Sequence, residues 1–113
     1  MNDSSIHVNT IIRSLDGLAL RHKVAASNLA NASTPGFKRR EVSFEDQLEQ
    51  AARGGRFEPE VTVDRSPGDA DGNNVVREDE VGALTRVELT YQALTRAMAH
   101  RANLMRLAVS SNR

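Results

Sequence analysis

The stretch Ala25-Ala-Ser-Asn-Leu-Ala-Asn-Ala-Ser-Thr-Pro-Gly-Phe-Lys38 sets the point at which a long helix must stop. Asparagine amides can bond the carbonyls that a helix leaves free at its end. The ring of Pro35 disfavours helical geometry at Thr34. Pro-Gly also fits the centre of a type II turn, in which Gly36 takes the positive φ that other residues resist. The stretch therefore predicts a helix before it, a turn within it and a new element after it.

An apolar stripe of helical spacing precedes this turn, at alternating steps of three and four residues. Its members are Val8, Ile11, Leu15, Leu18, His22, Ala25 and Leu29. The spacing predicts a coiled-coil helix of roughly 25 residues, about 38 Å long. Gly17 costs this helix roughly 1 kcal/mol relative to Ala, but it allows a neighbour to approach closely.

A second stripe follows the same rule near the other end of the chain. Its members are Leu84, Val87, Tyr91, Leu94, Met98, Arg101, Met105 and Ala108. We expect one helix from Val75 to about Val109, roughly 52 Å long, with Asn74 as its N-cap. We interpret Glu78, Asp79 and Glu80 as solvated residues of its first turn, where carboxylates complement the helix dipole.

The middle of the chain predicts shorter elements. A helix from Phe44 to about Arg53, capped by Ser43, would stop at two glycines. The alternating run from Phe57 to Val63 suggests a strand, which Pro59 confines to an edge. Turn-forming residues fill 66–74 and predict a loop or local disorder. The basic run 38–40 is interpreted as a solvated linker.

The expected fold is mainly α, with the long N- and C-terminal helices packed as an antiparallel coiled-coil pair and a short irregular, β-containing middle segment. We divide the chain into an N-terminal helix (1–34), a middle segment (35–73) and a C-terminal helix (74–113). The apolar stripes are wider than one partner can cover. The residues that widen them are Ile12, Ala19, Leu104, Leu107 and Val109. This surplus predicts contacts with neighbouring subunits.

Composition argues against several functional classes. The 113 residues hold 15 basic and 15 acidic side chains, three Phe, one Tyr, no Trp and no Cys. The balanced charge gives no whole-molecule attraction to nucleic acid or to an anionic membrane, and we expect no nucleic-acid partner. Disulfides and thiolate sites are excluded. No apolar run is long enough for a transmembrane segment, and the polar start of the chain predicts no cleaved signal peptide.

Candidate catalytic and metal sites are weak. Asp69, Asp71, Asn73 and Glu80 fall at positions 1, 3, 5 and 12 of a calcium loop, but position 6 is Asn74 rather than Gly, and position 9 is a cation. His22 lacks a second ligand at helical spacing, so we expect a half-buried packing residue. No nucleophile, base and pocket converge. We therefore expect no metal, no cofactor and no enzymatic activity.

Two segments resemble the bacterial flagellar rod and hook proteins. Residues 26–38 are similar to their N-terminal signature, Asn-Ile/Leu-Ala-Asn-Ala-x-Thr-Pro-Gly-Tyr/Phe-Lys. Residues 71–75, with Glu78 and Glu80, and then Leu89-Thr-Tyr-Gln-Ala-Leu-Thr-Arg96 resemble the C-terminal segment of a proximal rod protein. The family often has Asp-Leu where this chain has Val76-Arg77.

The resemblance implies a structural subunit of the flagellar basal-body rod. Such a subunit is exported through the flagellar type III apparatus without a cleaved signal. It polymerises in the periplasm as part of the drive shaft, between the membrane ring and export gate and the distal rod, and is required for motility. Its implied partners are other copies of itself, related rod proteins, a rod-base adaptor, and export gate and membrane ring proteins. The alternatives are another proximal rod subunit of the same family and a cytoplasmic helical adaptor.

The residues on which this interpretation depends are packing residues. Those of the expected assembly interface are Ile11, Leu15, Leu18, Leu29, Leu84, Val87, Tyr91, Leu94, Met98 and Met105. Those of the family-motif turn are Asn28, Asn31, Thr34, Pro35, Gly36 and Phe37.

Overall fold

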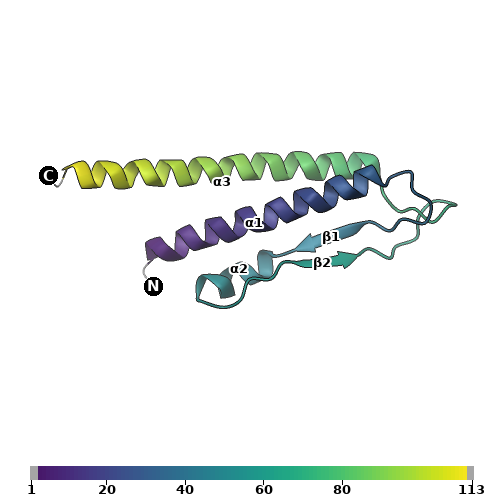
Figure 1. Cartoon of the computed structure of the whole chain (residues 1–113), viewed down its shortest axis with the longest axis horizontal. Coiled ribbons are helices and arrows are strands. Elements are labelled where there is room, and N and C mark those ends of the chain that lie inside the picture. Colours follow the sequence, from purple (N-terminus) through teal and green to yellow (C-terminus); the bar gives the residue numbers. More distant parts are fainter. Residues whose placement is uncertain (1–2, 112–113) are drawn as a thin grey trace.

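The computed structural model describes residues 3–111 and confirms the mainly helical class (Figure 1). Its elements are α1 (Asp3–Ala30), β1 (Arg40–Ser43), α2 (Glu45–Ala52), β2 (Glu60–Val63) and α3 (Arg77–Ser111). The molecule is long and flat, with extents of 69 × 26 × 13 Å. Both long helices begin and end within a few residues of the positions that the apolar spacing predicts, because Pro35 and the 66–74 loop interrupt helical geometry on either side.

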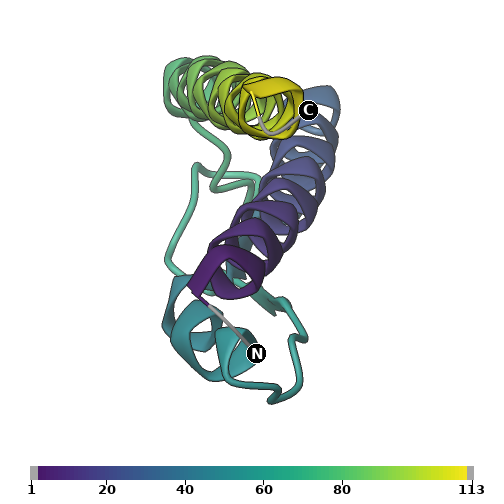
Figure 2. The same cartoon turned by 90° about the vertical axis from the view of Figure 1, so that its left-hand side faces the viewer.

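α1 and α3 run antiparallel, and they lie nearest to each other at the end of the molecule that holds the Pro-Gly turn (Figure 1). Leu18 and Val87 are buried between them, and Leu94 packs at the edge of the same cluster. The two helices diverge toward the chain termini, which the end-on view of Figure 2 shows as a crossing of their axes. α3 therefore extends past its contact with α1, and its last part lies apart from the other helices and strands that the structure describes (Figure 1).

A small antiparallel hairpin lies along α1 on the side away from α3. Arg40 pairs with Val63 and Val42 with Val61, so β1 and β2 form a two-stranded sheet. Val42 is buried against the helices, whereas every residue of β2 is exposed. The expected strand at residues 57–63 is confirmed in its second half. The interpretation of residues 38–40 as a solvated linker was wrong for Arg40, which begins β1.

Aromatic residues anchor the hairpin to α1. Phe44, which follows β1, is 3% exposed and lies directly over Gly17. The guanidinium of Arg21 lies 4.6 Å from the Phe44 ring centroid, and the ring of Phe57 meets that of Phe44 edge to face at 6.2 Å. The predicted close approach at Gly17 is confirmed, since a side chain there would occupy the space of the Phe44 ring.

α2 is shorter than expected by one residue at each end. Phe44 occupies its N-cap position and no side chain caps it, so the predicted Ser43 cap was wrong. The helix buries Ala51 and Ala52. These small residues let α2 lie close against its neighbours, and the chain turns back at Gly54, which has φ +90°.

Candidate functional site

The family-motif turn has the geometry that its sequence predicts. The Phe37 amide donates to the Thr34 carbonyl at 3.2 Å, and Gly36 has φ +73°, as the third position of a type II turn requires. The Asn31 side-chain amide donates to the Ser27 carbonyl at 2.9 Å and so satisfies a free carbonyl at the end of α1. Pro35 and Thr34 are exposed, so the turn itself lies at the surface.

The 66–74 loop holds this turn from the other side. The Asn73 side-chain amide donates to the carbonyls of Asn31 (2.9 Å) and Thr34 (2.8 Å), and Asn73 is buried. The Gly36 amide donates to the Asp71 carbonyl at 2.8 Å. The loop is thus fixed by hydrogen bonds to a segment about forty residues earlier in the chain, and the turn it holds is the one that ends α1.

Asn74 joins the loop to the hairpin rather than capping α3. Its side-chain oxygen accepts from the Arg39 amide at 2.7 Å, and its side-chain nitrogen donates to the carbonyls of Asp64 (2.8 Å) and Ser66 (3.2 Å). The N-cap prediction for Asn74 was wrong, since α3 begins three residues later, at Arg77. A single side chain here satisfies backbone groups on both strands at the open end of the hairpin, before β1 and after β2.

Glu80 lies at the centre of these contacts. It is only 1% exposed, so its interpretation as a solvated first-turn residue was wrong, whereas Glu78 and Asp79 are exposed as expected. Its carboxylate accepts from Arg39 Nε at 2.7 Å and from Asn28 Nδ2 at 3.2 Å. A buried carboxylate is stable only when it is paired and hydrogen-bonded, and both conditions are met here.

Arg39 carries the opposite charge of this buried pair. Burial opposes its charged form, but hydrogen bonds to the carboxylates of Glu80, Glu41 and Asp64 outweigh that cost and raise the pKa of Arg39 above its ordinary value. The guanidinium therefore remains charged and bridges β1, the residue that follows β2 and α3. The interpretation of Arg39 as part of a solvated linker was wrong.

Asn28 connects the same network to α1. It is 1% exposed, and its side-chain amide both donates to the Arg40 carbonyl (2.9 Å) and accepts from the Arg40 amide (3.0 Å). In this way it acts on β1 as a neighbouring strand would. We call Asn28, Arg39, Asn73, Asn74 and Glu80 the polar clasp. It ties α1, the hairpin, the loop and α3 together at one end of the molecule.

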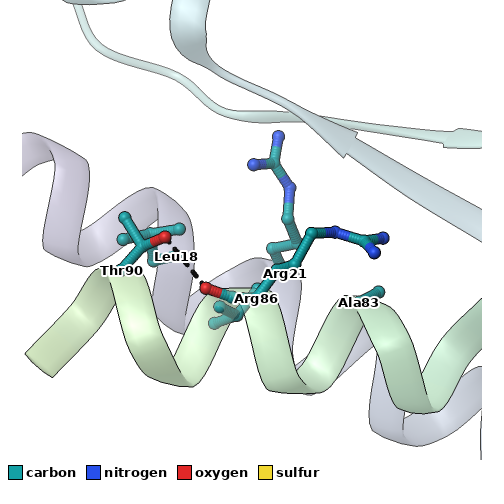
Figure 3. Close-up of a pocket in the computed structure, with 6 residues that line it drawn as sticks. Leu18, Arg21, Ala83, Arg86 and Thr90 are labelled. Atoms are coloured by element: carbon teal, nitrogen blue, oxygen red, sulfur yellow. Dashed lines mark hydrogen bonds between the residues drawn. The ribbon is translucent and has the colours of Figure 1, made fainter.

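Two shallow hollows flank the contact between α1 and α3. One is lined by Leu18, Arg21, Ala83, Arg86, Val87 and Thr90 (Figure 3). The other includes Ala19, His22, Glu88 and Tyr91. His22 is exposed at the edge of the second hollow, so the expectation of a half-buried packing residue was wrong.

Arg21 lines the first hollow, but its guanidinium is already bonded to other groups of the chain. It donates to the Val42 carbonyl at 2.8 Å and pairs with the Glu45 carboxylate at 2.6 Å. This hydrogen bond is the main cause that lowers the pKa of Glu45 to about 2. The arginine therefore fixes β1 and the start of α2 against α1. Its guanidinium is not available to a ligand in the hollow.

Within residues 3–111, no three His, Asp or Glu side chains lie together in a way that would hold a metal ion. Every buried side-chain nitrogen and oxygen in the described part of the chain has a hydrogen-bond partner. No described helix is long and apolar enough to cross a membrane. What the polar clasp can do chemically is hold segments in place.

The expected interface residues fall into three groups. Leu18 and Val87 are buried inside this chain. Tyr91 and Met105 are exposed. The others are half-buried: Ile11, Leu15, Leu29, Leu84, Leu94 and Met98. Sequence reasoning left Leu89 out of this set, although it is 62% exposed, because it lies off the stripe that faces α1.

Comparison with known proteins places this arrangement in a family. A family model described as flagella basal body rod protein matches residues 15–38, which form the second half of α1 and the turn that the clasp holds. The flagellar basal body rod protein FlgB of Borreliella burgdorferi is 32% identical over 125 aligned residues, covering 88% of this chain and 93% of that protein.

The chain belongs to the FlgB family of flagellar basal body rod proteins. FlgB of Bacillus subtilis is 27% identical, over 94% of this chain and 95% of that protein. FlgB of Aeromonas hydrophila is 32% identical over 90 aligned residues. The alignments to the Borreliella and Bacillus proteins cover most of this chain. Members of this family are structural subunits of the flagellar rod, and the chain is such a subunit rather than an enzyme.

Proposed function

We propose that this chain is a proximal rod subunit that is exported through the flagellar type III apparatus and polymerises in the periplasm. It forms the part of the drive shaft between the membrane ring and export gate and the distal rod, and motility requires it. Its partners are other copies of itself, related rod proteins, the rod-base adaptor, and the export gate and membrane ring proteins.

The observation that carries this proposal is the exposed last part of α3. We call residues 95–111 the α3 tail, a length of about 25 Å at the rise of an α-helix. Its Leu104, Met105, Leu107 and Val109 are each more than half exposed, and no other element of residues 3–111 packs over them. A helix whose apolar residues face water is stabilised when another subunit covers them.

The proposed interface combines the two apolar stripes. Ile11, Leu15, Leu29, Leu84, Leu94 and Met98 are half-buried and are available at the edges of the helix pair. Tyr91 and Met105 extend the α3 stripe into solvent. In this proposal segments 1–34 and 74–113 form the assembling core, and segment 35–73 folds back on α1 and is locked there by the polar clasp.

The experiment that tests the proposal is deletion of the gene, followed by a swimming assay and electron microscopy of basal bodies, with the gene restored as control. Loss of swimming with rings present but no rod or hook is the expected result. A mutant that swims with intact flagella would refute it. Restoring the gene as Leu107→Asp should fail, because the charge enters an interface, whereas Ser110→Asp on the same exposed turn tests for general intolerance of charge.

A second test concerns the free subunit. An isolated helix that lacks packing is marginal in water, so we expect the α3 tail to be less helical in the free chain than in the assembled rod. Circular dichroism at 222 nm of the purified chain and of assembled material measures this difference. Equal helicity per residue in the two states would contradict the expectation.

A further inference from the structure

Charge is divided along the long axis of the molecule. The α3 tail contains three arginines and one histidine, and no acidic residue occurs after Glu88. Residues 64–80, which we call the acidic end, contain six carboxylates and two arginines. The acidic end surrounds the Pro-Gly turn and the start of α3, and the tail lies at the opposite end of the molecule (Figure 1). The tail is thus basic, whereas the acidic end carries a group of carboxylates beside the cations Lys38, Arg39 and Arg40, which lie against it.

The tail presents its cations beside apolar side chains. Arg96 and Arg106 are exposed, and they share the helix with Leu104 and Leu107, which are 53% and 66% exposed. The Arg106 guanidinium donates to the side-chain oxygen of Asn103 on the same helix. An exposed surface of this composition, apolar with cations around it, suits a partner that is apolar with anions around it.

The acidic end has that complementary composition. The carboxylates of Asp64 and Glu80 form ion pairs with Arg39. Four carboxylates remain at the surface, and these are Asp69, Asp71, Glu78 and Asp79. Val76 and Val81, on either side of Glu78, are 48% and 50% exposed. The Arg77 guanidinium donates a hydrogen bond to the Ser33 hydroxyl, just past the end of α1, and so it is bonded to a group other than these carboxylates.

We propose that the α3 tail of one copy docks on the acidic end of a second copy of this chain, so that subunits follow one another head to tail. The proposal rests on the proposed function, because it names which copy-to-copy contact builds the rod. A head-to-tail contact joins two different surfaces and can continue as an open filament, as a shaft requires. Pairing two tails with each other would instead place arginines against arginines, which is unfavourable.

Charge reversal tests the contact in the full chain. The tail-reversed variant carries Arg96→Glu and Arg106→Glu, and the end-reversed variant carries Glu78→Lys and Asp79→Lys. All four residues are exposed, so the fold is expected to persist, and circular dichroism checks this. The matched control is Glu58→Lys with Glu60→Lys, an exposed pair near the start of β2 and away from the acidic end. Sedimentation velocity over a concentration series measures self-association of each chain.

The parent and the control should self-associate at low salt and do so more weakly at about 0.5 M salt, where charges are screened within a few ångströms. Each reversed variant should associate at least about tenfold more weakly, because like charges then meet. A mixture of the two reversed variants should recover association, because acidic and basic surfaces are again paired. A parent that stays monomeric, reversed variants that associate like the parent, or a mixture that fails to recover would each overturn the proposal.

Complementation separates this proposal from the proposed function. If the restored parent gene rescues rod formation and the tail-reversed gene rescues it equally well, the head-to-tail contact is refuted while the rod function stands. If deletion leaves rods intact, the rod function itself falls. Rescue by the parent but not by the tail-reversed gene supports both.

Discussion

Replacing Gly17 with alanine should destabilise the fold, although the same change stabilises most helices. In a helix interior, Gly→Ala gains about 1 kcal/mol from backbone entropy. Here a Cβ at residue 17 would lie 2.5–2.6 Å from Cγ, Cδ1 and Cδ2 of Phe44, far inside van der Waals contact. The ring is 3% exposed and packs against Phe57 and Arg21, so it has no free space into which to move.

The magnitude follows from the balance of these two effects. Overpacking a filled site costs about 1–3 kcal/mol, so the net change is a loss of about 1 kcal/mol of unfolding free energy. Gly82→Ala in α3 is the matched control. A Cβ there meets only Arg86 Nη1, at 3.3 Å, which is the mobile end of an exposed side chain. That variant should gain up to about 1 kcal/mol, and the two alanines should differ by about 2 kcal/mol.

Urea unfolding followed by circular dichroism at 222 nm measures both variants against the parent. A Gly17→Ala chain that is as stable as the parent, or more stable, would refute the reasoning. A double-mutant cycle gives a sharper test, because Gly17→Ala should become less costly once Phe44 is replaced by leucine. Additive effects of the two changes would show that the ring and the helix do not compete for the same space.

Three further predictions concern the clasp, the turn and the α1–α2 contact. Glu80→Ala should lower the unfolding free energy by about 1–3 kcal/mol, because it removes the buried acceptor of Arg39 Nε and Asn28 Nδ2 while Glu41 and Asp64 still pair with the guanidinium, whereas Asp79→Ala should change it by less than about 0.5 kcal/mol in the same urea experiment. Gly36→Val should lower the midpoint of thermal unfolding, at a cost of about 1–2 kcal/mol or more, because its φ of +73° is unfavourable for a β-branched residue; an unchanged midpoint would contradict the type II turn. The pKa of Glu45 is lowered from 4.5 to about 2 by its hydrogen bond to Arg21, so the stability it adds is present above pH 4.5 and is lost as the pH falls toward 2. Because this carboxylate is half exposed, the contribution is below about 1 kcal/mol, and the difference between parent and Glu45→Gln should shrink to nothing across that range.

The long helices and the turn between them could be predicted because their causes are local. Apolar residues at steps of three and four define a helical face whatever lies opposite, and Pro35 with Gly36 favours one turn geometry. Gly17 could be identified as a place of close approach, since a helix tolerates glycine at a cost that only a neighbour offsets. The neighbour itself, Phe44, could not be identified from the sequence.

The polar clasp could not be predicted, because its members are far apart in the chain. From the sequence, Glu80 is interpreted as an ordinary carboxylate of a helix's first turn, and Arg39 is interpreted as part of a charged linker. Their pairing depends on α3 returning beside β1. One feature of the sequence could have indicated such contacts, namely the asparagines at 28 and 31 and at 73–74. Side-chain amides both donate and accept, so they bond backbone groups wherever the fold brings them.

By itself, the sequence determined two long amphipathic helices, a Pro-Gly turn after the first and an excess of apolar surface that calls for neighbours. Only the tertiary structure decided that α1 and α3 diverge, that a hairpin covers α1 and that a buried ion pair joins the two halves. The physical reason is that spacing and backbone geometry act over a few residues. The burial of Glu80 and the exposure of Leu107 depend instead on which distant segment occupies the space beside them.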